Sequence, residues 1–345
     1  MTAAVLYGKE DVKIEKVPIP RVGDGEVLVK VQVALTCGTD LKVYQRGYHA
    51  RMIVPPALFG HELAGVIEEV GPGVRSFKKG MRVVALNSAP CQMCFYCSKH
   101  QENLCEDLLF NNGAYAEYIR IPRRIVELNM LAIPDSVTYE EAAMVEPLAC
   151  VLRGLHETKV EIGDTVTVIG GGPIGLMFVQ VATAIGCKVI SVVKRDSQVA
   201  AAKHMGAHEV VQITKVTDPV EAVRALSSGK RGSDVAIEAV GRPEAWEWAI
   251  DMVRKGGTVN FFGGCASGTK VQLDTNRLHY SEVTLKATFH HTPETVRKAF
   301  SLIAEKKIRS NDYITGEAPL SRLQQVLRHM LNRNGDIKTA IIPGH

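Results

Sequence analysis

The chain has 345 residues, which is too long for one ordinary hydrophobic core and predicts two domains. Hydrophobic residues make up 46% of the chain and charged residues 23%, so the composition excludes disordered and fibrous proteins. The formal net charge of +4 is small for this length and argues against binding to nucleic acid.

The first residues favour a cytoplasmic protein. The sequence MTAAVLYGKEDVKIEKV contains Lys9, Glu10, Asp11 and Lys13, whereas a signal peptide needs an apolar segment there. The chain has no stretch of about eighteen consecutive apolar residues, so we expect no transmembrane helix and no membrane partner. In the cytoplasm thiols stay reduced, and disulfides are therefore disfavoured.

Two kinds of strand pattern divide the chain at about residue 150. Before it, β-branched runs predict a barrel-like all-β domain, at 12–18, 26–36, 62–70, 81–87 and 115–121. After it, apolar strands alternate with helical stretches, which predicts a parallel, doubly wound sheet. These strands are expected at 165–170, 188–193, 209–213, 234–240, 258–263 and 284–289. From about 293 the chain is expected to be helical, and its last apolar strand, TAII, to return to the first domain.

Half of the eight cysteines lie in PCQMCFYCSKHQENLC at 90–105, namely Cys91, Cys94, Cys97 and Cys105. Reduced thiols exclude a disulfide knot, and no thioredoxin-like βαβ unit surrounds the cysteines. The last gap is too long for a bacterial iron–sulfur run, which would also have a proline after the fourth cysteine. Four thiolates at short spacing instead predict a closed, tetrahedral structural zinc site.

A second set of metal-binding residue types is spread over three motifs. TCGTD contains Cys37, Thr39 and Asp40, LFGHELAG contains His61 and Glu62, and MVEPLAC contains Glu146. Each residue alone has an ordinary explanation, such as a buried core cysteine or a solvated carboxylate. Together they form a nitrogen, sulfur and oxygen set suited to zinc with one position open for a ligand.

The strand at 165–170 leads into GGGPIGLMFVQVATAIG, in which Gly170, Gly172 and Gly175 fit the pattern GxGxxG. A strand precedes this loop, and a helix and a second strand follow it, which makes a mere tight turn the weaker interpretation. The glycines allow a tight turn, close approach of a pyrophosphate and close helix packing. We therefore expect a dinucleotide site that includes Pro173 and Ile174.

The joint order of Cys37, GHE at 60–62, the four cysteines, VEPLAC and GxGxxG resembles zinc-dependent medium-chain dehydrogenases/reductases over essentially the whole chain. The polyol branch, which includes sorbitol dehydrogenase, is the most similar. This resemblance implies a GroES-like catalytic domain, 1–148 and 286–345 with a zinc lobe at 90–106, and a Rossmann domain at 149–285.

The resemblance also implies two zinc ions per chain, one structural and one catalytic. Cys37, His61 and Glu62 correspond to ligands of the catalytic zinc, and Glu146 to a residue that binds this metal or holds its water. Which of the two glutamates is the resting ligand stays open. Thr39 corresponds to the relay hydroxyl, but Lys42 stands where the family often has a histidine, and His49 is another candidate to complete the relay.

The residues after the second strand of the alternating region decide between NAD and NADP. A typical NAD fingerprint has Asp or Glu there, about twenty residues after the glycines, which binds the ribose hydroxyls. Here Val193 occupies that place, and Lys194 and Arg195 follow. With no acid to repel a 2′-phosphate and two cations to bind it, NADP is expected to be preferred. The alternative is that Asp196 performs the NAD role.

The expected reaction is hydride transfer between NADP(H) and a secondary alcohol or ketone of a polyol, sugar or cyclitol. An L-threonine 3-dehydrogenase-like enzyme and a non-catalytic dinucleotide-binding relative are the alternatives. Tyr44, His290 and His291 are candidate substrate contacts, although one histidine could instead cap the helix that begins near Pro293. We expect a small-molecule substrate and a homo-oligomer, either a dimer or a tetramer.

Overall fold

The structure is a computed structural model that describes residues 1–49, 51–332 and 336–344. It divides into two compact units. The first comprises Met1–Ala149 and His291–His345, and the second comprises Cys150–His290. The second boundary therefore follows β16 (Thr284–Ala287), whereas the sequence-based boundary at 285/286 would cut through this strand. Within the described residues, no helix is both long and apolar enough to cross a membrane.

The described residues of the first unit form a barrel-like arrangement of three sheets, with strand orders β2-β1-β4, β10-β6-β5-β3-β18-β17 and β7-β8, and β9 pairs with β3. The strands are β1 (Thr2–Gly8), β2 (Asp11–Lys16), β3 (Val27–Leu35), β4 (Ala57–Leu58), β5 (Glu62–Val70), β6 (Arg82–Ala85), β7 (Ser88–Ala89), β8 (Leu109–Phe110), β9 (Tyr118–Ile121), β10 (Met130–Ala132), β17 (Ile314–Pro319) and β18 (Lys338–Ile342). The helices are α1 (Gly38–Arg46), α2 (Phe95–Ser98), α3 (Arg123–Leu128), α4 (Tyr139–Ala143), α11 (Pro293–Ala304) and α12 (Leu323–Leu331).

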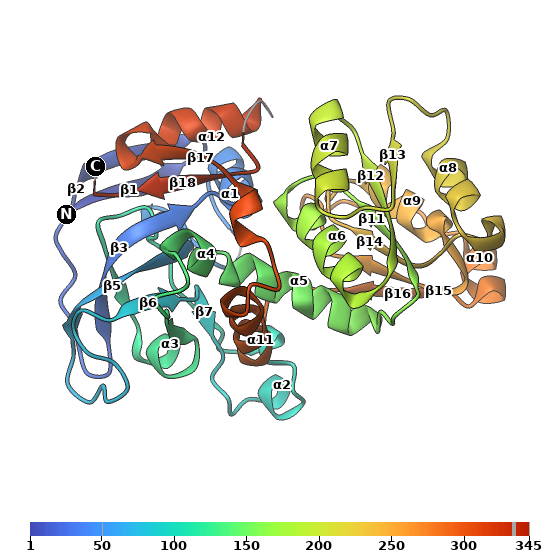
Figure 1. Cartoon of the computed structure of the whole chain (residues 1–345). Helices are drawn as coiled ribbons and strands as arrows, with labels where there is room; N and C mark the ends of the chain where they lie inside the picture. The colour runs from blue at the N-terminus through green and yellow to red at the C-terminus, as the bar shows by residue number, and fades with distance from the viewer. Residues whose placement is uncertain (50, 333–335, 345) are drawn as a thin grey trace. The chain divides into compact units, whose positions relative to one another are not determined.

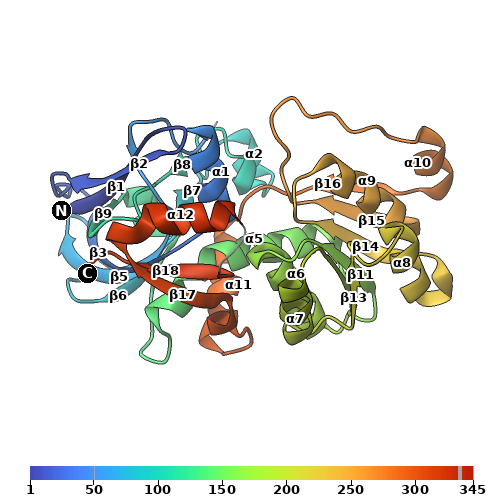
Figure 2. The same ribbon diagram turned by 90° about the horizontal axis from the view of Figure 1, so that it is seen from above.

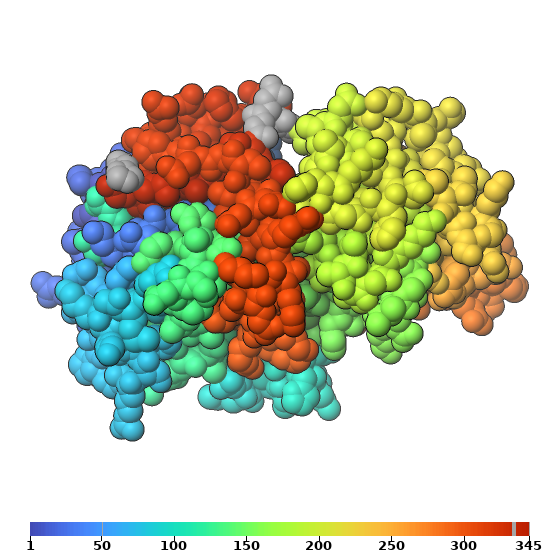
Figure 3. All heavy atoms as spheres, viewed as in Figure 1, coloured from blue at the N-terminus to red at the C-terminus, as the bar shows by residue number. Residues whose placement is uncertain are grey.

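The C-terminal strand completes the first unit, as the sequence predicts. Strand β18 (red) lies antiparallel beside β3 (blue), with Ala340 opposite Leu35 (Figure 1). Helix α12 packs against β17 and α1 (Figure 2). In the space-filling view, residues from both ends of the chain, blue and red, form one surface (Figure 3). The last residues of the chain are therefore part of the same domain as the first.

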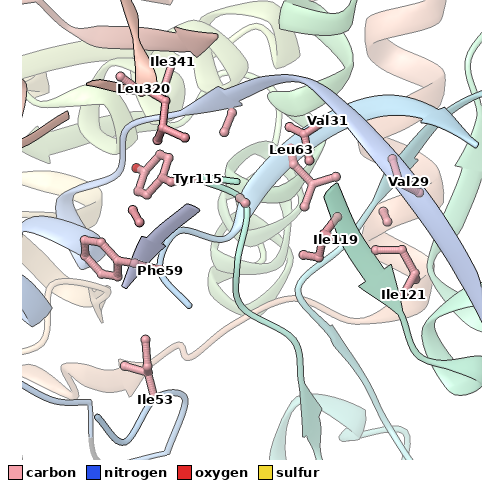
Figure 4. Packing of buried hydrophobic residues seen from close by; sticks show 14 of the residues in the cluster. Val29, Val31, Ile53, Phe59, Leu63, Tyr115, Ile119, Ile121, Leu320 and Ile341 are labelled. Atoms are coloured by element: carbon pink, nitrogen blue, oxygen red, sulfur yellow. The ribbon is translucent and has the colours of Figure 1, made fainter. Parts of the chain in front are cut away.

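The hydrophobic core of the first unit lies between its strands. Phe59 and Tyr115 pack edge to face there with ring centroids 5.6 Å apart (Figure 4). Tyr44 belongs to the same core and is only 3% exposed. The structure therefore does not support the predicted substrate contact of Tyr44, because its ring is used in packing.

The second unit is a parallel six-stranded sheet with the order β13-β12-β11-β14-β15-β16, which is the doubly wound Rossmann arrangement. Helices α6 and α7 lie on one face, and α8 and α9 lie on the other (Figure 2). The strands are β11 (Thr165–Ile169), β12 (Lys188–Val193), β13 (Glu209–Gln212), β14 (Ser233–Glu238), β15 (Val253–Phe261) and β16. The helices are α6 (Pro173–Ile185), α7 (Asp196–His204), α8 (Pro219–Leu226), α9 (Pro243–Met252) and α10 (Thr275–Ser281), and α5 (Val145–Thr158) runs from the first unit into the second.

Candidate active site and metal centres

Cys37, His61 and Glu62 come together where two neighbouring strands meet. Strand β3 ends at Leu35, β5 begins at Glu62, and the antiparallel register places these two residues opposite one another. Cys37 then caps the N-terminus of α1. One ligand atom from each of the three side chains lies within 4.8 Å of the others. This sulfur, nitrogen and oxygen set fits zinc with a position left for a further ligand.

His61 is held in one orientation by a buried hydrogen-bonded chain. Its Nδ1 lies 2.8 Å from Asp40 Oδ1, and Tyr115 donates to Asp40 Oδ2 at 2.7 Å. A carboxylate only accepts, so Nδ1 carries the proton and Nε2 is left with its lone pair for a metal. Burial lowers the pKa of His61, but the charges of Asp40 and Cys37 outweigh it and raise the pKa well above its usual value.

The glycine of the GHE motif makes room for this arrangement. Gly60 has a φ of 89°, and a Cβ atom there would lie 2.5 Å from the ring of Tyr115. Any larger residue would therefore have to displace the tyrosine that supports Asp40.

Glu62 forms a second buried pair, with a lysine from the other end of the chain. Lys338 Nζ donates to Glu62 Oε2 at 2.5 Å and to the carbonyl oxygen of Thr36 at 2.8 Å. Burial lowers the pKa of Lys338, but the Glu62 carboxylate outweighs it and the pKa is raised. Burial raises the pKa of Glu62, and Lys338 opposes this rise.

Glu146 is buried in the first turn of α5, and it does not belong to the group formed by Cys37, His61 and Glu62. Burial raises its pKa to about 7, against the opposing charge of His61. Thr39 lies in the first turn of α1, where its backbone N–H donates to Cys37 Sγ at 3.4 Å. His49 Nδ1 accepts hydrogen bonds from the backbone amides of Arg51 and Met52, so this nitrogen is engaged by nearby backbone groups.

The four lobe cysteines converge as the sequence spacing predicts. Their sulfur atoms lie within 4.8 Å of one another, with Cys91–Cys97 at 4.0 Å and Cys94–Cys105 at 3.8 Å. Zinc–sulfur bonds of about 2.3 Å in a tetrahedron give sulfur separations of about 3.8 Å. The four sulfur atoms are therefore already spaced as zinc ligands would be. Backbone amides lower the pKa of Cys94 to about 6, whereas burial raises that of Cys97 to about 12. A metal ion is what would ionise the buried thiol.

The glycine-rich loop joins β11 to α6 in the second unit. Gly172 is the N-cap of α6, and a Cβ atom added there would meet no heavy atom within 4 Å. A Cβ atom on Gly175 would instead collide with the carbonyl oxygen of Gly170. The loop therefore combines open space at the helix N-terminus with close helix–strand packing, which fits a pyrophosphate. Pro173 and Ile174 form the first turn of α6.

Strand β12 ends on Val193, which is buried, and Lys194 and Arg195 lead into α7. Asp196 is the first residue of α7, and its Oδ1 accepts from Lys215 Nζ at 3.0 Å and from Gln212 Nε2 at 3.1 Å. The hydrogen bond from Lys215 is the main reason that the pKa of Asp196 is lowered.

Neither predicted histidine caps helix α11. Thr292 is the N-cap and forms a capping box with Thr295. His291 is buried, and its Nε2 lies 3.1 Å from Asn87 Oδ1. His290 is also buried, stacks on Phe289 and has a φ of 64°, which is unusual for a residue with a side chain.

The sequence analysis gave no role to three residues of the site, although it named Asp40 within TCGTD. Asp40 carried a local signal, because it follows Cys37 by one helical turn within TCGTD. Tyr115 and Lys338 carried none, because they reach the site from strands and loops far away in the sequence.

Comparisons with known proteins agree with this geometry. The family model described as "Alcohol dehydrogenase GroES-like domain" matches residues 23–135, and "Zinc-binding dehydrogenase" matches residues 173–305. A sorbitol dehydrogenase from Bacillus subtilis (strain 168) is 33% identical over 99% of this chain and 97% of its own length. An L-threonine 3-dehydrogenase from Bacillus licheniformis is 31% identical over 97% of this chain and 96% of its own length.

A solved zinc-binding dehydrogenase from Sinorhizobium meliloti, bound to NADP, is 29% identical with a TM-score of 0.89 and covers 99% of both chains. Both domains are thus matched in order along the chain. The chain belongs to the zinc-dependent medium-chain dehydrogenase family, in its polyol branch, and is an oxidoreductase that acts on alcohols with zinc and a nicotinamide cofactor.

Proposed function

We propose that the protein oxidises a secondary alcohol of a polyol, sugar or cyclitol to the ketone, or reduces the ketone, with NADP(H) and a catalytic zinc. The observation that carries the proposal is the convergence of Cys37, His61 and Glu62 within 4.8 Å, with His61 fixed by Asp40. The polyol class is supported by the sorbitol dehydrogenase relative.

A zinc ion held by these residues would lower the pKa of a substrate hydroxyl, as zinc lowers that of water from about 15.7 to about 7. Asp40 keeps His61 in the tautomer that presents Nε2. The proton that leaves the alcohol must reach solvent, and Thr39, next to Cys37 at the start of α1, is the proposed first hydroxyl of that relay. Glu146, with a pKa near 7, can accept or release a proton at neutral pH.

NADP preference is supported by the end of strand β12. Val193 is apolar and buried, so no carboxylate at this position repels a 2′-phosphate. Asp196 is already paired with Lys215 and Gln212, which reduces its use as a partner for the ribose hydroxyls. Lys194 and Arg195 provide cations next to the strand end, and Arg suits two-point phosphate contact. The relative from Sinorhizobium meliloti was solved with NADP bound.

Initial rates with each cofactor test this preference. Charged hydrogen bonds contribute about 1.5–3 kcal/mol, so kcat/KM with NADP should exceed that with NAD by at least about tenfold. Arg195→Ala should lower the NADP value much more than the NAD value. Lys203→Ala, a charge removal in the last turn of the same helix, should leave the ratio unchanged. Equal or better efficiency of the wild-type enzyme with NAD would show that the preference is wrong.

A substrate panel separates the three candidate functions. Polyols, sugars and cyclitols are assayed beside L-threonine, since an L-threonine 3-dehydrogenase is among the relatives. We expect the highest kcat/KM with a member of the first group and two zinc ions per chain by metal analysis. L-Threonine as the best substrate would identify the alternative enzyme. One zinc or none, without turnover of any compound, would identify a non-catalytic protein.

A further inference from the structure

The buried pair Glu62–Lys338 adds a positive charge to the proposed catalytic metal site. Glu62 is 1% exposed and Lys338 is 2% exposed. The ammonium group is held by two acceptors, Glu62 Oε2 and the carbonyl oxygen of Thr36. Lys338 is the first residue of β18, and this strand is fixed in register by β3 and β17. The lysine is thus rigidly placed beside the carboxylate.

The two oxygens of Glu62 are in different situations. Oε2 accepts from Lys338 at 2.5 Å, whereas Oε1 is buried and has no hydrogen-bond partner. A buried carboxylate oxygen without a partner is costly unless a cation or donor meets it. Cys37 and His61 supply the neighbouring ligand atoms of the same cluster. Oε1 is therefore the oxygen left for the metal.

We propose that Lys338 is a positioning residue that holds Oε2 of Glu62 by a hydrogen bond. Glu62 can then bind the metal through Oε1 alone, and it binds the metal weakly. The inference rests on the proposed catalytic zinc at Cys37, His61 and Glu62. Without the lysine, the carboxylate can turn both oxygens to the metal, as carboxylates commonly do with hard cations. Two-oxygen binding would tighten the metal and fill the position that a substrate hydroxyl needs.

The positive charge of Lys338 determines whether this residue strengthens or weakens metal binding. Partners that accept a hydrogen bond from a ligand make that ligand more basic and strengthen metal binding. Lys338 does the opposite, because its positive charge draws electron density from Glu62 and repels a divalent cation. Removing it should therefore slow the loss of metal from the loaded protein.

The test follows the release of Co²⁺, substituted for zinc, to an excess of 1,10-phenanthroline. Lys338→Met should release the metal of the catalytic site at least about tenfold more slowly than wild type. Its visible Co²⁺ absorption should weaken, because a higher coordination number gives weaker bands. Lys338→Arg, which keeps the charge, should restore the wild-type rate and spectrum. Lys306→Met, which breaks the pair with Glu141 instead, should leave both unchanged.

A double-mutant cycle isolates the role of Glu62. In a Glu62→Gln background no carboxylate can be released, so the effect of Lys338→Met should largely disappear. Equal slowing in both backgrounds would show that the lysine acts by charge alone, and unchanged or faster release in Lys338→Met would overturn the inference outright. If the Met variant does not fold, Lys338→Gln replaces it, since it keeps a donor for Thr36 without the charge. Wild-type protein that binds only the lobe metal would instead refute the catalytic zinc itself.

Discussion

Single residues decide how the proposed metal ligands are presented. His61 is fixed by Asp40, which is in turn fixed by Tyr115, and all three are buried. Mutation of such hydrogen-bond partners of a metal ligand typically lowers metal affinity or activity by about 10–100-fold. Asp40 contacts His61 directly, whereas Tyr115 acts through Asp40. Loss of the Asp40 carboxylate should therefore weaken the site more than loss of the Tyr115 hydroxyl.

Asp40→Asn should lower kcat/KM by about 10–100-fold, because the amide no longer selects the His61 tautomer or supports its basicity. Tyr115→Phe, which removes only the hydroxyl donor, should have a smaller effect. Steady-state kinetics with metal analysis of each variant checks the order. Asp40→Asn protein with wild-type turnover and full zinc content would contradict the assigned role of the carboxylate.

His291 should make the stability of the protein depend on pH. Burial lowers its pKa to about 3 from an ordinary value of 6.5, so the folded state holds this imidazole neutral. Its contribution is fully present above pH 6.5 and is lost as pH falls toward 3. Between pH 6.5 and about pH 3, this residue alone should lower the free energy of unfolding by about 1.4 kcal/mol for each unit by which the pH falls.

Urea unfolding at pH 7 and pH 5 measures the effect, with His291→Gln as the control. The wild type should lose about 2 kcal/mol more than the variant between these two values. Equal losses would mean that His291 is protonated in the folded protein or that its burial is not maintained.

At the scale of elements, the sequence predicts a structural feature best when the residues that form it lie close together in the chain. The four lobe cysteines lie within sixteen residues, and their spacing alone indicates the cage. Tyr44, predicted as a substrate contact, is buried together with Asp40 and Val43, and these three residues follow the spacing of one buried helix face. Lys338 could not be found in this way, because 276 residues separate it from Glu62, and the two are brought together through β3, which pairs with both β18 and β5.

The zinc lobe should be structural, so Cys97→Ser should affect folding more than chemistry. Loss of one thiolate removes the metal and with it the folding free energy that metal binding contributes. We expect a lower Tm, lower soluble yield and a decrease from two zinc ions to one per chain. Cys187→Ser, at a buried cysteine of the second unit outside both ligand sets, is the control. An unchanged Tm with full zinc content in Cys97→Ser would show that the cage has no structural role.

For the whole molecule, the alternation of strands and helices predicts the parallel, doubly wound Rossmann sheet. The first unit is harder to predict, because it is assembled from both ends of the chain. Its short strands β4, β7 and β8 contain only two residues each and leave no periodic pattern in the sequence. The site depends on this closure, since Lys338 enters with the last strand.

The two units should differ in their ability to fold alone. Residues 150–290 are continuous and have their own hydrophobic core, so this segment should unfold cooperatively when expressed by itself. Residues 1–149 lack β17 and β18, so β3 loses its pairing with β18 and Glu62 loses Lys338, and this segment should be insoluble or unfolded. If the NADP proposal is correct, calorimetry should show that the 150–290 segment binds adenosine 2′,5′-bisphosphate at least about tenfold more tightly than ADP. Arg195→Ala in the same segment should remove this preference, while Lys203→Ala should keep it. A folded segment that binds both ligands equally would locate the error in the cofactor assignment, whereas an unfolded segment would show that the second unit depends on the first.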